Sequence, residues 1–176
     1  MILKAAKKHS RAGEKLKVVG VDAGEQTRRV QEAVARRAYE IFGRRGCASW
    51  HELEDWRQAE AELVRPCCSG QMSVDGTLWM GTDAAIFEEG TIEVWVAPRQ
   101  LTICGKPSAG KEGVAAATKW SGSHPDGEMI FHVIDLTCEI DPSRVSAKID
   151  GPSLEILLKK AGLEPEAKRE MKVAVA

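Results

Sequence analysis

Apolar and polar residues alternate along three short stretches in the last third of the chain, which span residues 130–136, 145–149 and 154–158. Turn-forming residues separate the stretches, at Asp141-Pro142 and again at Asp150-Gly151-Pro152. A period of two between apolar residues is typical of strands with one buried face. We therefore predict three consecutive strands here, joined by two turns.

Three more strands are predicted upstream, within residues 77–86, 91–96 and 101–106. In the second of these, Ile92, Val94 and Val96 share one face, and Trp95 falls on the opposite face. A tryptophan on that face is either covered by another segment, for which we expect a neighbouring subunit, or exposed for binding. Trp95 is therefore predicted to contact a partner subunit or a client protein. We expect Trp79 in the core or at a sheet edge.

The spacing changes to the helical period between residues 26 and 64, which we predict to form an αα-hairpin. The sequence Ser49-Trp50-His51-Glu52 has the form of a capping box at the start of the second helix. A hairpin of this size buries too little to be stable alone, so we expect it to pack on the β domain, on another copy or on a client. The residues expected to pack it together are Val34, Ile41, Leu53, Trp56 and Leu63, with Trp50 at the head of the second helix.

These patterns predict a chain that is mainly β, with a helical hairpin before the strands. The expected parts are a basic flexible arm (1–23), the helical hairpin (24–65), a linker (66–76), a β-sandwich (77–161) and a C-terminal tail (162–176).

The turn and strand residues near the end of the chain resemble the last part of the α-crystallin domain of small heat-shock proteins. The residues that carry this resemblance are Asp141, Pro142, Ala147, Gly151 and Leu154. Gly151 falls one position early, and Pro152-Ser153 stand where the family has glycine and valine. The resemblance covers roughly residues 74–161 and implies an immunoglobulin-like antiparallel β-sandwich of the α-crystallin type. The alternative is an unrelated antiparallel sandwich with the same periodicity.

The predicted hairpin is similar to a short bacterial helical domain of unassigned function. The segment that carries the similarity runs from Arg36 to Leu63. That domain sometimes precedes α-crystallin domains, so the two resemblances support each other, but it implies no activity.

Charge and cysteine content limit which partners and which cellular compartment we expect. The chain has 25 basic and 26 acidic residues, a formal net charge of -1, which gives no general attraction to nucleic acid or membranes. No apolar run reaches the ~20 residues of a membrane span, and no secretory signal is recognisable. The five cysteines show no disulfide pattern, so we expect a reducing cytoplasm. The first twenty residues are basic, through Lys4, Lys7, Lys8, Arg11, Lys15 and Lys17. They form either an arm for phosphates or acidic partners or, as we prefer, a solvated tail.

No pattern in the chain predicts catalysis. Residues 105–111 lack the spacing of a phosphate-binding loop, and Cys47, His51 and Cys67-Cys68 lack the usual spacing of zinc ligands. His132 lies on the face of its strand that is predicted to be buried, where we expect a hydrogen-bonded, partly buried side chain. We predict no catalytic residue, no cofactor and no metal, and we do not expect an enzyme.

The resemblance to small heat-shock proteins implies an ATP-independent holdase that binds unfolding client proteins. It also implies a homo-oligomer built from dimers, in which a strand of the 107–128 loop, with Trp120, would cross to a partner. Val173 and Val175 resemble the apolar anchor that many members carry in their tails, for docking at a neighbour's sheet edge. No membrane partner is expected, and nucleic acid is not expected either. The alternatives are a non-enzymatic adaptor that uses the same sandwich, and a nucleic-acid-associated stress protein that acts through its basic arm.

Overall fold

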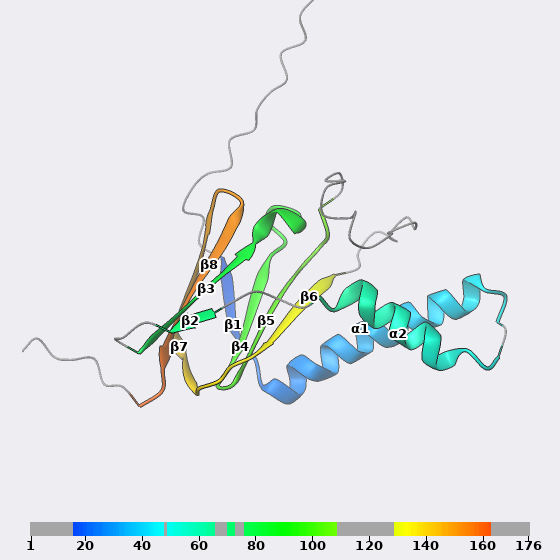
Figure 1. Cartoon of the computed structure of the whole chain (residues 1–176), viewed down its shortest axis with the longest axis horizontal. Coiled ribbons are helices and arrows are strands. Elements are labelled where there is room, and N and C mark those ends of the chain that lie inside the picture. Colours follow the sequence, from blue (N-terminus) through cyan, green and yellow to red (C-terminus); the bar gives the residue numbers. More distant parts are fainter. Residues whose placement is uncertain (1–15, 48, 66–69, 73–75, 109–128, 163–176) are drawn as a thin grey trace, which may run out of the picture.

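A computed structural model describes residues 16–47, 49–65, 70–72, 76–108 and 129–162. Helices and strands follow one another in an order that starts with a strand (Figure 1). The elements are β1 (Lys17–Gly20), α1 (Ala23–Arg44), α2 (Glu52–Leu63), β2 (Gly70–Met72), β3 (Thr77–Asp83), the 3-10 turn η1 (Ala84–Ile86), β4 (Glu93–Ala97), β5 (Gln100–Gly105), β6 (Ile130–Asp135), β7 (Ile140–Asp150) and β8 (Ser153–Lys160). The described part of the chain is therefore mostly strand, with two helices near its N-terminus.

The strands form two four-stranded sheets. Sheet A has the order β2-β3-β8-β7, and sheet B has the order β1-β4-β5-β6. All neighbouring pairs are antiparallel except β1 and β4, which are parallel. The two sheets share one apolar core, to which β3, β8 and β7 contribute from sheet A and β4, β5 and β6 from sheet B. This arrangement is a two-sheet sandwich, in which alternate residues of each strand point into the core.

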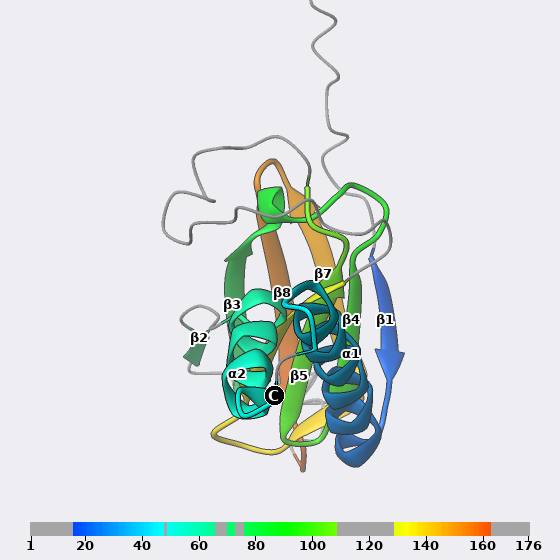
Figure 2. The same ribbon diagram turned by 90° about the vertical axis from the view of Figure 1, so that its right-hand side faces the viewer.

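The helical hairpin packs with its base on the outer face of sheet B and extends beyond the strands at its loop end (Figures 1 and 2). A second apolar cluster forms between the helices and this sheet. Its buried members are Val34, Ile41, Ala59, Leu63, Trp95, Cys104 and Phe131. The hairpin therefore packs on the β domain of its own chain, which is one of the three arrangements expected from its size.

Strand β1 lies within the segment predicted to be a flexible arm. It pairs with β4 from Lys17↔Glu93 to Gly20↔Val96, and Lys17 Nζ lies 2.5 Å from Glu93 Oε1. Val18 packs against the sandwich core, and Val19 packs against the cluster under the helices. At least residues 17–20 are thus part of the folded domain, because both faces of this strand find apolar cover.

The N-terminus of each helix differs from the sequence prediction. Helix α1 begins at Ala23, three residues before the predicted start at Gln26, because Asp22 caps it. Asp22 Oδ1 accepts hydrogen bonds from the Gly24 and Glu25 amides at 2.9 and 3.4 Å. The capping box predicted at Ser49 is wrong. Helix α2 begins after His51 without any side-chain cap, and Glu52 accepts instead from the amide of Trp50 at 3.3 Å.

Helix α1 ends just before a glycine with a positive φ. Gly46 has φ +78°, the Cys47 amide bonds to Phe42 O at 3.1 Å and the Gly46 amide to Gly43 O at 3.1 Å. This pair of bonds is a Schellman motif, which turns the chain away from the helix axis.

The predicted turn at Asp141-Pro142 is wrong, because both residues lie within β7. The pairing of β7 with β8 shifts between Ile140 and Val145, so the segment forms an irregularity inside one long strand. Pro142 is tolerated there because β7 is the last strand of sheet A. The second predicted turn is found: Asp150 pairs with Ser153, and Gly151 has φ +60°, as a two-residue hairpin turn requires.

Candidate binding surfaces

Large apolar side chains are exposed at six described positions on two separate surfaces. Four of them belong to the helical hairpin: Tyr39, Trp50, Leu53 and Trp56. The other two, Trp79 and Leu157, lie on the outer face of sheet A. Exposed apolar residues that cluster in this way mark candidate binding surfaces.

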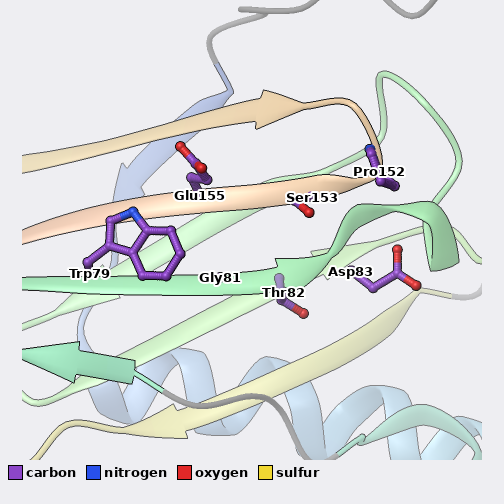
Figure 3. A pocket seen from close by; sticks show the side chains of 7 residues that line it. All are labelled: Trp79, Gly81, Thr82, Asp83, Pro152, Ser153 and Glu155. Atoms are coloured by element: carbon purple, nitrogen blue, oxygen red, sulfur yellow. The ribbon is translucent and has the colours of Figure 1, made fainter.

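Trp79 and Leu157 face each other across β3 and β8, and they are 41% and 38% exposed. The Trp79 ring extends over Gly81, where an added Cβ would come within 3.4 Å of the ring. Beyond this ring lies a shallow hollow of about 450 Å³, which Figure 3 shows from close by. The glycine leaves room for the ring to lie flat along the sheet, so an apolar shelf forms beside the hollow.

The far rim of the hollow is polar. Its lining includes Asp83, Glu155 and Ser153, together with Pro152 from the β7–β8 turn. Glu155 is held by Lys148 of β7 at 2.7 Å, and Asp83 Oδ1 accepts a hydrogen bond from the Ala85 amide at 2.8 Å. The surface thus joins an apolar shelf to hydrogen-bonding groups, which suits an extended polypeptide better than a compact apolar ligand.

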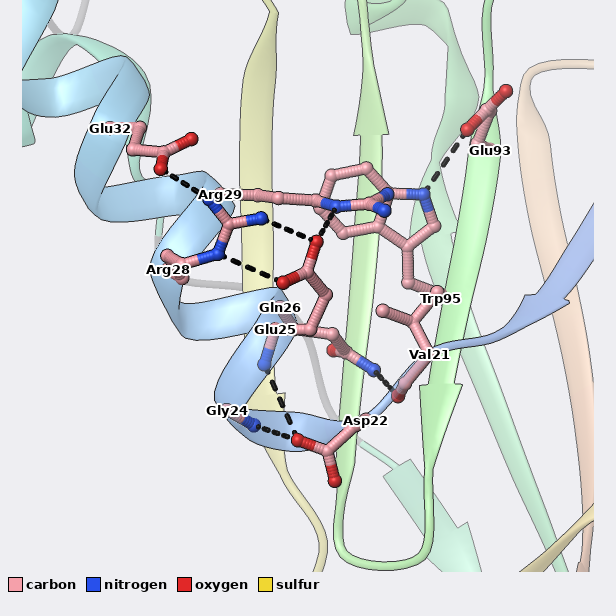
Figure 4. A network of polar contacts seen from close by, with 10 residues as sticks. All are labelled: Val21, Asp22, Gly24, Glu25, Gln26, Arg28, Arg29, Glu32, Glu93 and Trp95. Atoms are coloured by element: carbon pink, nitrogen blue, oxygen red, sulfur yellow. Dashed lines mark hydrogen bonds and ion pairs between the residues drawn. The ribbon is translucent and has the colours of Figure 1, made fainter.

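Trp95 is 5% exposed, since helix α1 of its own chain covers it. Figure 4 shows the ring beneath Arg29, whose guanidinium carbon lies 5.2 Å from the ring centroid. The indole Nε1 donates to Glu93 at 3.1 Å, and Phe131 lies beside the ring at 6.0 Å between centroids. The prediction that a partner subunit or a client contacts Trp95 is therefore wrong for the folded monomer: the cover comes from a segment that precedes it by more than fifty residues.

A chain of polar contacts anchors α1 above sheet B (Figure 4). Gln26 is 1% exposed; its Nε2 donates to Val21 O at 2.9 Å, and its Oε1 accepts from Thr102 Oγ1 of β5 at 2.8 Å. The Glu25 carboxylate accepts hydrogen bonds from Arg29 and Arg28, and these bonds lower its pKa. Because each buried polar atom of Gln26 finds a partner, the contact selects one position of the helix on the sheet.

Only some of the hairpin residues that were predicted to pack are buried. Val34, Ile41 and Leu63 are buried, as expected. The prediction is wrong for Leu53 and Trp56, which are 62% and 37% exposed. Ala59 is the residue of α2 that packs toward the sheet instead. Two buried charged groups complete the contact between the helices: Arg37 binds Glu62 at 2.6 Å, and Asp55 accepts from Arg45 at 2.5 Å.

The residues that carry the α-crystallin resemblance are spread along the β7–β8 hairpin of sheet A, with Asp141 and Pro142 at one end and Gly151 at the turn. Leu154 is fully buried and pairs with Ile149, while Ala147 is 6% exposed and pairs with Ile156. Asp141 Oδ1 accepts from the amide of Ser143 at 2.9 Å and from its hydroxyl at 2.6 Å, and these bonds lower the pKa of the carboxyl group. Their roles are structural ones in this arrangement: core packing, a hairpin turn, and a side-chain contact that braces the irregular start of an edge strand.

Two buried titratable side chains occupy the two apolar clusters. His132 is 5% exposed beside Phe87, at 5.4 Å between ring centroids, and neither ring nitrogen has a hydrogen-bond partner within the described ranges. The expectation of a hydrogen-bonded histidine is therefore wrong there. Burial, together with the nearby charge of Arg65, lowers the pKa of His132 to about 4. Burial raises the pKa of Cys104 to about 12, so its thiol stays protonated and packs as a small apolar group.

Three predicted contact residues, Trp120, Val173 and Val175, lie outside the described residues. Cys67 and Cys68 lie outside them as well. Among the helices that are described, none has the length and apolar character needed to cross a bilayer.

Comparison with known proteins finds one partial family match and two partial structural likenesses. Residues 29–64 match a family described as "Protein of unknown function (DUF2934)". Heat shock protein 16.0 from Schizosaccharomyces pombe is similar in structure, with a TM-score of 0.41 and 16% identity, over 59% of this chain and 79% of that one. Stress-induced protein 1 from Caenorhabditis elegans has a TM-score of 0.39 and 16% identity, over 61% of this chain and 100% of that one. No curated protein matches the chain. Structural likenesses with TM-scores this low carry no conclusion about function.

Proposed function

We propose that this protein is an ATP-independent holdase that binds unfolding polypeptides on the outer face of sheet A. The observation that supports the proposal best is the exposed pair Trp79 and Leu157 beside a shallow hollow. The α-crystallin resemblance of the β7–β8 region points to the same function. We further propose that the protein acts in the cytoplasm as a homo-oligomer built from dimers.

The physical argument rests on what unfolding clients offer. A polypeptide that loses its structure exposes apolar side chains and unpaired backbone groups. The Trp79–Leu157 shelf can take the apolar side chains, while Asp83, Ser153 and Glu155 provide hydrogen-bonding groups beside it. Such binding needs no catalytic group, because a protein that binds the unfolded state acts by mass action.

The test is an aggregation assay with model client proteins, in the absence of ATP. The wild-type protein should suppress aggregation caused by heat or by reduction, and Trp79→Ser with Leu157→Ser should weaken the suppression several-fold. Ser146→Ala serves as the matched control. Ser146 lies on β7 and points to the same outer face of sheet A as Trp79 and Leu157, but its side chain is small and polar. Absence of suppression at several-fold molar excess over several clients would remove the holdase proposal.

A second candidate function is a non-enzymatic adaptor in which the hairpin recognises one specific partner. The exposure of Trp50, at 92%, favours it, because an exposed tryptophan is a common anchor in protein interfaces. The two candidates differ in their clients: a holdase protects many unrelated proteins, whereas an adaptor binds one partner and protects none.

A further inference from the structure

One edge of helix α2 and the residue that precedes its cap carry large apolar side chains that the described segments leave wholly or partly exposed. This edge, called the α2 edge below, consists of Trp50, Leu53 and Trp56 with Glu52 and Glu60. Trp50 is 92% exposed, Leu53 62% and Trp56 37%. Glu52 and Glu60 stand four residues before and after Trp56, so they lie on the same side of the helix.

The α2 edge points away from α1. Asp55 and Glu62 mark the side of α2 that contacts the α1 segment, through Arg45 and Arg37. At 3.6 residues per turn, Leu53 and Trp56 lie roughly 100–180° around the helix from those two positions. The buried residues Ala59 and Leu63 face the sheet. Trp56 lies seven residues before Leu63 and therefore borders the side that faces the sheet, whereas Leu53 and the preceding Trp50 stand on the free side of the hairpin, where packing within the described chain does not explain them.

Trp50 is also held in an unusual backbone conformation. Its φ is +80°, in the left-handed region that side chains with a Cβ rarely adopt, and Cys47 in the same loop has φ +59°. Such a conformation is strained for a residue with a Cβ, and residues of this kind concentrate at ligand clamps and other functional sites. Because the Trp50 side chain is exposed in the monomer, no burial of its ring offsets this backbone strain. This points to a role of the ring in binding.

The charge of α2 indicates the kind of partner. The helix has five acidic residues and one basic residue, Arg57. Two of the acidic residues are engaged with Arg45 and Arg37, which leaves Glu52, Glu54 and Glu60 on its exposed surface. Two such helices placed against each other would repel, so a symmetric pairing of α2 with α2 is disfavoured. The matching partner is a basic segment with some apolar residues.

The first fifteen residues of this chain have that character. They carry Lys4, Lys7, Lys8, Arg11 and Lys15 against Glu14, and they begin with Met1, Ile2 and Leu3. Lys4, Lys8, Arg11 and Lys15 follow one another at spacings of four, three and four, and Lys7 is three residues after Lys4, so all five would share one face if the segment became helical on binding. We propose that the basic segment 1–15 of a second copy of this chain docks on the α2 edge.

The position of the two elements favours a second copy over the same molecule. Residue 16 leads into β1, at one end of sheet B, whereas α2 contacts β6, at the other end of the same sheet (Figure 2). Fifteen extended residues span at most about 50 Å, and the α2 edge faces away from α1. A molecule would have to lead its own segment around the whole hairpin, which would leave few residues for the contact. The segment of a neighbour has no such restriction.

The proposed contact is heterologous, because it joins two different surfaces of the same chain. Heterologous contacts close into rings or continue as open assemblies, rather than stopping at a dimer. The contact should also weaken with salt, since exposed charges are screened. This assembly does not depend on holdase activity, and the mass of the particles in solution tests it directly.

The first experiment compares full-length variants by light scattering coupled to size-exclusion chromatography. Trp50→Ser with Leu53→Ser should reduce the average particle mass at least twofold at low salt, because both side chains are exposed and their loss leaves the fold intact. Trp79→Ser is the matched control, an exposed tryptophan on sheet A, and should leave the mass unchanged. A synthetic peptide of residues 1–15, added to the wild-type protein, should lower the mass in the same way.

The second experiment exchanges the charges. Lys4, Lys7 and Lys8 are changed to Glu in one full-length variant, and Glu52 and Glu60 are changed to Lys in another. Each variant alone should lose at least half of the particle mass, and the chain that carries all five changes should regain it, since every copy then holds both reversed surfaces. Far-ultraviolet circular dichroism checks that α2 remains folded in each variant.

Two results would overturn the proposal. One is an unchanged particle mass in the Trp50 and Leu53 variant; if that variant also loses aggregation suppression, the α2 edge binds client proteins instead. The other is failure of the combined charge exchange to restore the mass while the chain stays folded.

Discussion

Trp95 and Trp56 each differ from their prediction: Trp95 was expected to contact a partner subunit or a client and is buried, whereas Trp56 was expected to pack within the hairpin and is partly exposed. Trp95 lies under α1 at 5% exposure, with Arg29 over its ring and Glu93 as acceptor for its N–H. Trp56 is 37% exposed on the flank of α2. Burial of a large ring contributes stability mainly through the apolar area removed from water, so the two should differ strongly in energetic importance.

We predict that Trp95→Ala lowers the free energy of unfolding by about 3–5 kcal/mol, as is usual for loss of a buried aromatic ring. Trp56→Ala should cost only about 1 kcal/mol, because much of its ring is already in water. Urea denaturation followed by circular dichroism measures both. Equal losses in the two variants would show that the hairpin does not lie on sheet B as described.

His132 should make the stability of the protein depend on pH. Its pKa is lowered from 6.5 to about 4 by burial and by Arg65, so the unfolded chain takes up a proton at a higher pH than the folded one. The contribution to stability is therefore complete above pH 6.5 and is lost as the pH falls toward 4, by about 3 kcal/mol in all. Chemical denaturation at several pH values between 7 and 4 measures this loss.

A variant without the titrating ring separates this effect from the titration of carboxyl groups. His132→Phe should remove most of the slope between pH 6.5 and 4.5, since a phenyl ring suits the apolar surroundings next to Phe87. His51→Gln is the matched control, because the His51 side chain is 48% exposed. A slope in His132→Phe equal to that of the wild type would contradict the assignment to His132.

At the scale of elements, the two helices begin in different ways. Asp22 caps α1 through two backbone amides, whereas α2 begins without a side-chain cap although Ser49 and Glu52 have the spacing of a capping box. Asp22→Ala should cost about 1 kcal/mol of stability. Ser49→Ala should change stability by a few tenths at most, since the residue lies outside the helix.

Thermal unfolding of both variants checks the contrast. A cost of about 1 kcal/mol for Ser49→Ala would mean that the capping box forms after all. The signal for Asp22 was present in the sequence, because Asp22 and Glu25 have the same spacing as Ser49 and Glu52. Only the structure distinguishes the two, because a cap also needs the residue before the helix to adopt the extended backbone that lets its side chain reach back.

At the scale of the whole molecule, the hairpin decides which surfaces remain open. It covers the outer face of sheet B, so the outer face of sheet A is the free broad face of the sandwich within the described residues. Strand β1 in addition occupies the edge of β4. A tail segment from a neighbour would therefore have to dock at another sheet edge, and β7 ends sheet A.

We keep the proposal that Val173 and Val175 anchor the tail at such an edge. Residues two apart point the same way in an extended segment, so both valines can enter one groove. Val173→Asp with Val175→Asp should shift large particles toward dimers and leave the sandwich folded, as measured by analytical ultracentrifugation. If the double variant keeps the wild-type mass, the tail does not serve in assembly. Because these changes leave Trp50 and Leu53 intact, the two assembly contacts can be told apart.

The sequence by itself determined the features that depend on neighbours along the chain. The alternation in β4 identified which face of that strand enters the sandwich core, because Ile92, Val94 and Val96 must point one way and Trp95 the other. The spacing of Val34, Ile41 and Leu63 identified most of the buried side of the hairpin. The turn at Gly151 followed from its flanking strands, since the residue needs a positive φ there.

Only the tertiary structure decided what covers each face. Periodicity predicts that Trp95 points away from the core. The segment that covers its ring is α1, which is far away in sequence. The hydrogen bond between Gln26 and Thr102 holds α1 in this position. Strand β1 was missed for a similar reason: a segment of four residues has too few positions to show a period, and it is a strand because β4 offers it a parallel edge. Leu53 and Trp56 have the spacing of packing residues, yet α2 turns Ala59 toward the sheet instead. Helical spacing predicts which residues share a face, and contacts between distant segments decide whether that face is buried.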